Sequence, residues 1–298
     1  MLRDPSPNTV RAYTSDVRDF ADWCAEQRVA LLPASPETVL LYITHLAQRG
    51  AKASTIQRRL PAISHAHELA GHVPSPTTDP LVRTAMAGIR RSLGTVPVQK
   101  TAMVTAELRR LVAATPADTL AGRRDRALLL LGFAGGLRRS ELVALDMEDV
   151  RETMDGLRVR LRGSRSAQDG EADEVRIPIA QHPDTCPMRA LRAWRCAAGI
   201  TTGALFRAVN RHDQLASERL SDGSVARIVQ RAARRAGLDP SRYASQSLRR
   251  GLATAAAQCG APARAIMRRG CWTSVAVAHR YIRAAAVAQE KALATCGR

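Results

Sequence analysis

The 298-residue sequence has few aromatic residues, almost no lysine and no long apolar run. Aromatics make up only 3% of the chain, so aliphatic side chains and alanine must fill the core. No apolar run approaches the ~20 residues that a membrane-spanning helix needs. The N-terminal residues MLRDPSPNTV also lack the apolar segment of a signal peptide. We therefore expect a cytoplasmic protein with no membrane partner.

The cysteines and the other residues that could bind a metal show no pattern of a metal site. The six cysteines are scattered and contain no C-x-x-C pair, which argues against a zinc site and against a disulfide framework. No carboxylate cluster and no histidine-rich group offers ligands for a metal-dependent nuclease. A chain of this length can bury a substantial core without such crosslinks. We expect no cofactor and no bound metal.

Basic residues dominate the charge. The chain has 45 lysines and arginines against 27 aspartates and glutamates, which gives a net charge of +18. Such a charge favours a polyanionic partner, and nucleic acid is the first candidate because each neutralised phosphate releases counterions. A generally basic protein without that role is the alternative. The only lysines are Lys52, Lys100 and Lys291.

The first ~95 residues predict four helices, because apolar residues recur there at steps of three and four. Ser35–Pro36 and Asp79–Pro80 each place a capping side chain before a proline, as at the start of a helix. The third helix starts near Ser54, and Pro61 predicts a kink in it. The residues predicted to face inward on the first three helices are Val10, Tyr13, Val17, Phe20, Cys24, Val39, Leu40, Ile43, Leu46, Ile56, Leu60 and Ile63.

Several arginines lie on the third and fourth of these helices. Arginines on a helix often form only a solvated face, but on consecutive helices of a basic protein they can follow a row of phosphates. We predict the second role, DNA binding. These arginines are Arg58, Arg59, Arg83, Arg90 and Arg91.

A linker over residues 95–104 separates a helical domain over 1–94 from a larger domain over 105–298. The linker is predicted because GTVPVQK has glycine and proline but no period. The larger domain opens with a helix capped by Thr105. In it, the apolar run 127–136 predicts a deeply buried helix, and alternation over 156–163 and 174–180 (including Ile179) predicts a β-hairpin. Further helices are predicted over 187–198, 223–236, 247–259, 262–269 and 274–281. The fold class is mainly α with a small antiparallel β-sheet.

Three residues far apart in the sequence suit chemistry on a DNA phosphate. Arg138 in GGLRRSELVAL and Arg249 in QSLRRG can each hold a pair of phosphate oxygens. The phenol of Tyr281, in HRYIR, can attack phosphorus. Glu141 shares a helix face with Arg138 and can hold its guanidinium. A structural Arg–Glu pair and a packing tyrosine are the alternatives.

The surroundings of Arg249 suggest an anion site. We expect Arg249 in the first turn of a helix that is capped by Ser245 or Ser247. Gln246 precedes it by three residues, so both side chains project to one side. Glutamine can donate a hydrogen bond to phosphate, but it cannot take a proton from a phenol.

These segments closely resemble the tyrosine recombinase (phage integrase) family. The resemblance also covers NTVRAYTSDVRDFADWC and STIQRRLPAI near the N-terminus, and so nearly the whole chain. It implies a two-domain DNA clamp, in which a helical, SAM-like N-terminal core-binding domain joins a mixed α/β catalytic domain. Tyr281 is then the nucleophile, and Arg138 and Arg249 stabilise the phosphate.

Three further positions follow from the same resemblance. Trp272 occupies a place that is His or Trp in the family, and its indole N–H can donate to a phosphate oxygen. Gln246 stands where the family has histidine. Arg165 stands where the family has a hairpin lysine that protonates the leaving oxygen. Arginine is a poor proton donor, although it can stabilise a developing alkoxide.

The resemblance predicts a site-specific DNA recombinase or integrase that cuts and rejoins DNA through a 3′-phosphotyrosyl intermediate, without a cofactor. Its partner is double-stranded DNA, bound by a homotetramer on two DNA sites, alone or together with a second recombinase. A nucleoid-associated cytoplasmic location follows. A catalytically weakened DNA-binding or regulatory partner of another recombinase is the alternative, since Gln246 and Arg165 replace both proton-transfer residues. A relaxing topoisomerase is a third possibility.

Overall fold

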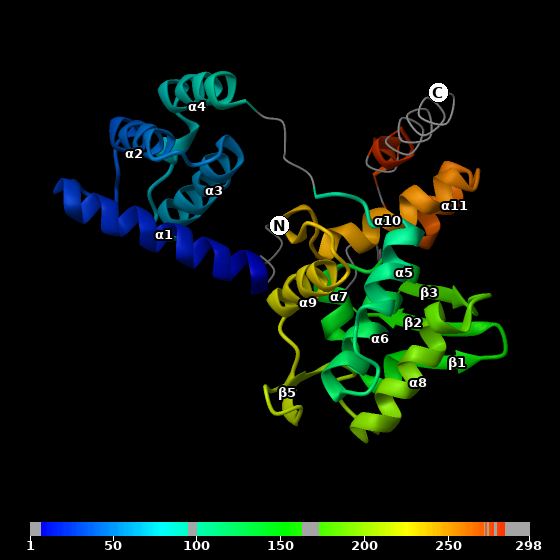
Figure 1. The fold of residues 1–298 in the computed structure, drawn as a ribbon. Helices are drawn as coiled ribbons and strands as arrows, with labels where there is room; N and C mark the ends of the chain where they lie inside the picture. Colours follow the sequence, from blue (N-terminus) through cyan, green and yellow to red (C-terminus); the bar gives the residue numbers. More distant parts are fainter. Residues whose placement is uncertain are drawn as a thin grey trace. The chain divides into compact units, whose positions relative to one another are not determined.

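Two units make up the chain, residues 1–98 and 99–298, and each has its own core (Figure 1). The computed structural model describes residues 7–94, 100–162, 173–270, 272, 274–276 and 279–283. Both units are mainly helical, and the second also contains small antiparallel sheets, so the predicted secondary-structure class is confirmed. None of the helices in these ranges has the length and apolar character needed to span a membrane.

Helices form the described part of the first unit. Its elements are α1 (Pro7–Gln27), α2 (Pro36–Gln48), α3 (Ala53–Leu69), the 3₁₀ turn η1 (Pro76–Thr78) and α4 (Pro80–Leu93). Both predicted caps are confirmed: Ser35 Oγ accepts from Thr38 N at 3.2 Å, and Asp79 Oδ1 accepts from Leu81 N at 2.7 Å. Helix α3 runs through Pro61 without ending there.

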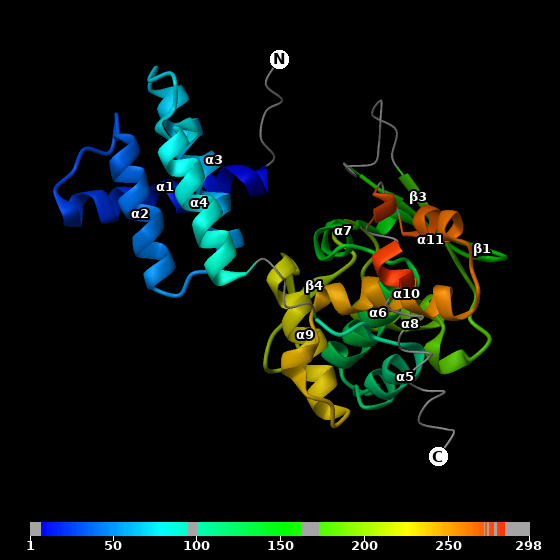
Figure 2. The same cartoon turned by 90° about the horizontal axis from the view of Figure 1, so that it is seen from above.

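An aromatic cluster lies at the centre of this unit. The Tyr42 ring centroid is 4.8 Å from that of Phe20 and 5.3 Å from that of Trp23. Most residues predicted to face inward are buried or half-buried. Val10 is an exception at 46% exposure, because the first turns of α1 extend past the other helices of the unit (Figure 2).

The second unit alternates helices with short strands. Its elements are α5 (Thr105–Ala113), α6 (Leu120–Ala134), α7 (Arg139–Ala144), η2 (Met147–Asp149), β1 (Val150–Thr153), β2 (Gly156–Leu161), β3 (Asp173–Pro178), η3 (Pro183–Thr185), α8 (Pro187–Ala198), β4 (Arg207–Val209), β5 (Leu215–Arg219), α9 (Asp222–Arg235), η4 (Pro240–Arg242), α10 (Ser245–Gln258) and α11 (Ala263–Arg269). Residues 275–276 and 279–283 are also helical.

The predicted central helix is confirmed as α6. Its residues 128–131 are at most 1% exposed, and α8 and α10 pack beside it (Figure 2). The prediction that Thr105 caps helix α5 is wrong, because the N-cap is Val104 and Thr105 is the first helical residue. Valine has no capping oxygen, and the Glu107 carboxylate accepts from Val104 N at 3.1 Å instead.

The predicted hairpin is present as the antiparallel strands β2 and β3, with β1 on the other side of β2. Val159 pairs with Val175 and Leu157 with Ile177, so the buried face is the apolar one. Ile179 was placed wrongly on that face: β3 ends at Pro178, and Ile179 is 48% exposed. The sequence pattern also missed β1 and the hairpin β4–β5, which are too short to show a clear alternation.

Candidate active site

One cavity in the second unit brings several of the predicted residues together. Its volume is about 490 Å³, and the start of α7, the start of α10 and the helical residues 279–283 all contribute to its wall. The residues that line it are Lys100, Leu137, Arg138, Arg139, Ser140, Ala226, Ala244, Ser245, Gln246, Arg249 and Tyr281. The sequence predicted Arg138, Gln246, Arg249 and Tyr281 for one site, and all four line this cavity.

The turn between α6 and α7 aims Arg138 at the cavity. Gly136 has φ +59°, a left-handed conformation that glycine adopts without strain, and it reverses the chain after α6. Arg138 is the N-cap of α7, and its backbone N–H donates to Glu141 Oε2 at 2.7 Å. The Arg138 guanidinium pairs with the other carboxylate oxygen of Glu141. Glu141 thus holds both ends of Arg138, while the arginine side chain stays 37% exposed.

Arg249 reaches the same cavity from α10. The helix begins at Ser245 after the N-cap Ala244, so Arg249 lies in the second turn and not, as predicted, in the first. The reason is that Ser247 caps from inside the helix: its Oγ accepts from Ala244 N at 3.1 Å. Arg249 is only 9% exposed, and its Nη1 donates to the carbonyl of Gly136. This bond ties Arg249 to the turn that carries Arg138.

The rings of Trp272 and Tyr281 lie next to the buried arginine and are tilted by 52° to each other. The guanidinium carbon of Arg249 lies 4.5 Å from the Trp272 ring, and the Trp272 and Tyr281 ring centroids are 5.7 Å apart. Trp272 is 8% exposed and packs with Ile266 and Ala253, whereas Tyr281 is half-buried and lines the cavity. Trp272 therefore supports the guanidinium from beside the cavity, and its indole as a phosphate donor stays a prediction.

Arg250 is a neighbour of Tyr281 that the sequence reasoning missed. Its guanidinium carbon lies 5.7 Å from the Tyr281 ring, and its Nη1 donates to the carbonyl of Lys100. Burial is the main cause that lowers the pKa of Arg250, and Tyr281 opposes that shift. A guanidinium stays protonated in proteins, so Arg250 places a cation beside the phenol. The double arginine in QSLRRG was the sequence signal for a second cation near the site, but spacing alone did not place the side chain of Arg250.

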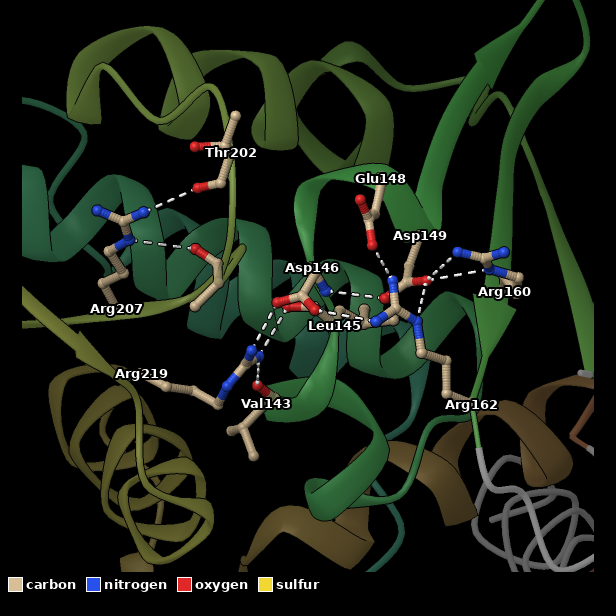
Figure 3. A network of polar contacts seen from close by, with 11 residues as sticks. Val143, Leu145, Asp146, Glu148, Asp149, Arg160, Arg162, Thr202, Arg207 and Arg219 are labelled. Carbon is tan, nitrogen blue, oxygen red and sulfur yellow. Dashed lines mark hydrogen bonds and ion pairs between the residues drawn. The ribbon is translucent and has the colours of Figure 1, made fainter.

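Polar contacts hold the end of α7 and the turn η2 that follows it (Figure 3). Asp149 is 2% exposed and accepts from Arg160 Nε at 3.1 Å and from Arg162 Nε at 2.8 Å, both on or next to β2. Arg219, at the end of β5, donates to the carbonyls of Val143 and Leu145 at 2.8 and 3.0 Å. These contacts fix the end of α7 against both sheets, and so they steady the helix that Arg138 begins.

The remaining predicted residues belong to the first unit, apart from Arg165. Arg165 falls outside the described residues. In the first unit, Arg58 pairs with the buried Asp16, and Arg59 pairs with Asp19. The side chain of Arg59 is 16% exposed, so it is largely committed to this unit. The exposed arginines of α4 are Arg83, Arg90 and Arg91.

Comparison with known proteins identifies relatives over most of the chain. The model of the "Phage integrase family" matches residues 102–287, and that of the "Phage integrase, N-terminal SAM-like domain" matches residues 2–70. An "Integrase/recombinase xerD homolog" of Selenomonas ruminantium is 41% identical over 293 residues, which cover 98% of this chain and 86% of that protein. A "Tyrosine recombinase XerD" of Xanthomonas axonopodis pv. citri is 28% identical over 260 residues, which cover 87% and 81%.

Solved structures share the fold at low sequence identity. A lambda integrase dimer bound to a COC′ core site has a TM-score of 0.62 at 18% identity, covering 94% of this chain and 90% of that one. The Tn1549 transposon integrase in complex with transposon right end DNA has a TM-score of 0.61 at 12% identity, covering 98% and 95%.

Proposed function

Because the chain belongs to the phage integrase family and is a site-specific tyrosine recombinase, we propose that Tyr281 cuts DNA by forming a 3′-phosphotyrosyl link. One observation carries the proposal: a single cavity holds Tyr281 together with Arg138, Gln246 and Arg249. The covalent link conserves the energy of the broken phosphodiester, so the same site can rejoin strands without a cofactor.

Arg138 and Arg249 would stabilise the reacting phosphate. As the phenolic oxygen of Tyr281 bonds to phosphorus, the bond to the 5′-oxygen breaks and negative charge builds on the non-bridging oxygens. Two guanidinium groups, each with a fork of N–H donors, match that charge. Both are held in place before DNA arrives, Arg138 by Glu141 and Arg249 by the carbonyl of Gly136. Holding the groups ready lowers the entropic part of the barrier.

Gln246, Trp272 and Arg165 would have supporting roles. Gln246 is exposed at the cavity wall, where its amide can donate to a phosphate oxygen. Trp272 would hold the Arg249 guanidinium through its ring. Arg165, whose place in the sequence falls between the residues of β2 and those of β3, would stabilise the leaving oxygen by charge alone.

Double-stranded DNA is the partner, in keeping with the DNA-bound relatives. We propose that residues 1–94 form the core-binding domain, 95–104 the linker and 105–298 the catalytic domain of a DNA clamp. In the first unit, the exposed Arg83, Arg90 and Arg91 are the better candidates for phosphate contacts, because Arg58 and Arg59 already pair with aspartates. Binding DNA would keep the protein with the nucleoid.

A homotetramer on two DNA sites, alone or with a second recombinase, completes the proposal. A second cavity of about 570 Å³ supports it, because it lies between β3 and the helices α10 and α11 and could receive a segment of a neighbouring protomer. Its apolar part is formed by Val175, Ala256, Ala261, Ala265 and Ile266. The alternative of a regulatory partner that binds without cutting is not favoured by the relatives, which are recombinases.

A covalent-adduct assay tests the nucleophile. Duplexes that the protein binds are selected from a random-sequence library, nicked at successive steps, and incubated with the protein. We expect a protein–DNA adduct that survives denaturation and maps to one phosphate. Tyr281→Phe should abolish the adduct and leave DNA binding intact, because only the nucleophilic oxygen is removed. The matched control, Tyr13→Phe in the first unit, should leave it unchanged.

Two outcomes would contradict the proposal. An adduct that persists in Tyr281→Phe would mean that another residue attacks. Tight binding with no adduct from the unaltered protein, even on a nicked duplex, would point to the DNA-binding alternative.

A further inference from the structure

Strand cleavage needs a proton for the 5′-oxygen as it leaves. The cavity offers few side chains that can give one. A guanidinium is too weak an acid, a glutamine amide does not ionise, and a serine hydroxyl is no more acidic than the leaving alcohol. The Tyr281 phenol is consumed as the nucleophile. Among the described residues that line the cavity, only Lys100 carries an ammonium, which is a stronger acid than a guanidinium or an alcohol.

We propose that Lys100 is a catalytic residue, the general acid that protonates the leaving 5′-oxygen of DNA. The inference rests on the proposed function, because it assumes that Tyr281 attacks in the same cavity. As the phosphorus–5′-oxygen bond breaks, the Lys100 ammonium gives its proton to that oxygen and becomes an amine. The phenolic proton of Tyr281 goes to solvent, and solvent restores the ammonium. In strand rejoining, the ammonium first returns a proton to solvent, and the resulting amine takes the proton of the attacking 5′-hydroxyl. The released Tyr281 phenolate takes a proton from solvent.

The backbone around Lys100 is tied to the part of the site that carries Arg249. Thr101 N donates to the carbonyl of Arg242 at 2.8 Å, and Met103 N donates to the carbonyl of Ser247 at 2.9 Å. The carbonyl of Lys100 accepts from Arg250 Nη1. Residues 100–103, here called the tethered segment, therefore run along the start of α10. Because three bonds hold this segment, Lys100 keeps its place at the cavity wall.

Gly251 makes this close approach possible. A Cβ at residue 251 would lie 1.9 Å from the carbonyl oxygen of Met103 and 2.8 Å from the Phe133 ring. Any side chain there would push the tethered segment off α10. The glycine of QSLRRG thus has a structural purpose that serves the position of Lys100.

The Lys100 ammonium is held by one hydrogen bond and has further N–H groups that can donate. Lys100 Nζ donates to the carbonyl of Ser241 at 2.6 Å, in the turn η4. An ammonium has three N–H groups, so two remain for other acceptors. Lys100 is half-buried, which leaves it open to solvent for reprotonation. The anchor comes from a carbonyl and not from a carboxylate, so the proton is not shared with a competing base at that contact.

The position of Lys100 also explains how the site can work with Arg165 where the family resemblance implies a lysine. The proton and the electrostatic support need not come from one residue. Lys100 would supply the proton from the side of the tethered segment, and Arg165 would supply only charge. The two roles therefore separate in experiments.

A sulfur-substituted duplex distinguishes proton donation from a structural role. At the mapped scissile phosphate, sulfur replaces the bridging 5′-oxygen; the thiolate is a good leaving group and needs no proton. We expect Lys100→Met to slow cleavage of the oxygen-linked duplex by about 10²- to 10⁴-fold, the usual contribution of a general acid. The same variant should cleave the sulfur-linked duplex at close to the rate of the unaltered protein.

Two further variants sharpen the test. Lys100→Arg keeps a cation and a donor for Ser241, so it should fold normally and still be slow on oxygen-linked DNA, with rescue by sulfur. Lys52→Met removes the other described lysine, which is exposed before α3, and should cleave both duplexes at the normal rate.

The outcomes separate this inference from the proposed function. Equal slowing of Lys100→Met on both duplexes would give Lys100 a structural role, and normal cleavage of oxygen-linked DNA would make it dispensable; either overturns the inference alone. Rescue by sulfur in Arg165→Met, with Lys100→Met unaffected, would assign the acid to Arg165 and overturn it as well. No adduct from the unaltered protein on either duplex would overturn the proposed function and this inference together.

Discussion

Gly251→Ala should destabilise the second unit, although glycine-to-alanine changes inside helices usually stabilise. In α10 the change gains about 1 kcal/mol of intrinsic helix propensity. Against this, the new Cβ would lie 1.9 Å from the Met103 carbonyl oxygen, a distance that forces the backbone apart. Overpacking of this kind costs about 1–3 kcal/mol. The hydrogen bond from Met103 N to the Ser247 carbonyl would also break, at a cost of about 1 kcal/mol. The net expectation is a loss of about 1–3 kcal/mol.

Gly88→Ala is the matched control, because Gly88 also lies inside a helix, but apart from the adjoining helix backbone no atom lies within 4 Å of the position of its missing Cβ. It should stabilise the first unit by about 1 kcal/mol. Urea unfolding followed by tryptophan fluorescence measures both changes, since Trp23 reports the first unit and Trp194 the second. The Gly251 variant should also slow cleavage of oxygen-linked DNA more than that of sulfur-linked DNA, because it displaces Lys100.

Unchanged or increased stability of the Gly251 variant would refute this reasoning. It would mean that the tethered segment does not lie against α10, and the placement of Lys100 would fall with it. Loss of stability with no change in cleavage would keep the packing and reject its link to catalysis.

Two predictions concern other parts of the molecule. Replacing Arg83, Arg90 and Arg91 by glutamine should weaken binding to a random-sequence duplex. It should also reduce the slope of log affinity against log salt by about 1 for each DNA phosphate that the variant no longer neutralises, and an unchanged slope would exclude a DNA contact on α4. Arg59→Gln should instead lower the unfolding free energy of the first unit. Burial first, and then the hydrogen bond to Glu107 at 2.8 Å, raises the pKa of Tyr243 to about 12. Because this folded-state pKa is above the usual value near ~10, the Tyr243 contribution to stability is full below pH ~10 and disappears as pH rises toward about 12. Tyr243→Phe should remove that alkaline dependence in urea titrations; if the dependence remains, another group causes it.

Helices were predicted correctly from the sequence where the apolar pattern was long or where a side-chain oxygen caps the helix. The apolar run of α6, the boundaries of α8 and the two Ser/Asp–Pro caps all appear as expected. Each depends on local chemistry: an all-round apolar helix must be buried, and a side-chain oxygen before proline satisfies backbone N–H groups. The short strands β1, β4 and β5 have too few residues for alternation to stand out.

The site was predictable only as a set of residues. Spacing placed Arg138 next to Glu141, because residues three apart on a helix are neighbours. It could not place Lys100 beside η4, because the Lys100 ammonium contacts the carbonyl of Ser241, 141 positions away, and every residue has such a carbonyl. For the same reason Arg250 was not foreseen as a neighbour of Tyr281. Contacts of this kind depend on tertiary packing, for which a local pattern carries no signal.

The two arginines that we propose to bind the phosphate are coupled through a single turn. Arg249 Nη1 donates to the Gly136 carbonyl, and the backbone N–H of Arg138 is held two residues later by Glu141. A Cβ at Gly136 would lie 2.8 Å from Leu252 Cδ2, so α10 packs against this turn as well. Movement of α10 would therefore carry the turn and Arg138 with it, and the distance between the two guanidinium groups would change little. Because the tethered segment is bonded to the same helix, the groups proposed to bind the phosphate and to protonate the leaving oxygen share one rigid support, as a reaction that depends on positioning requires.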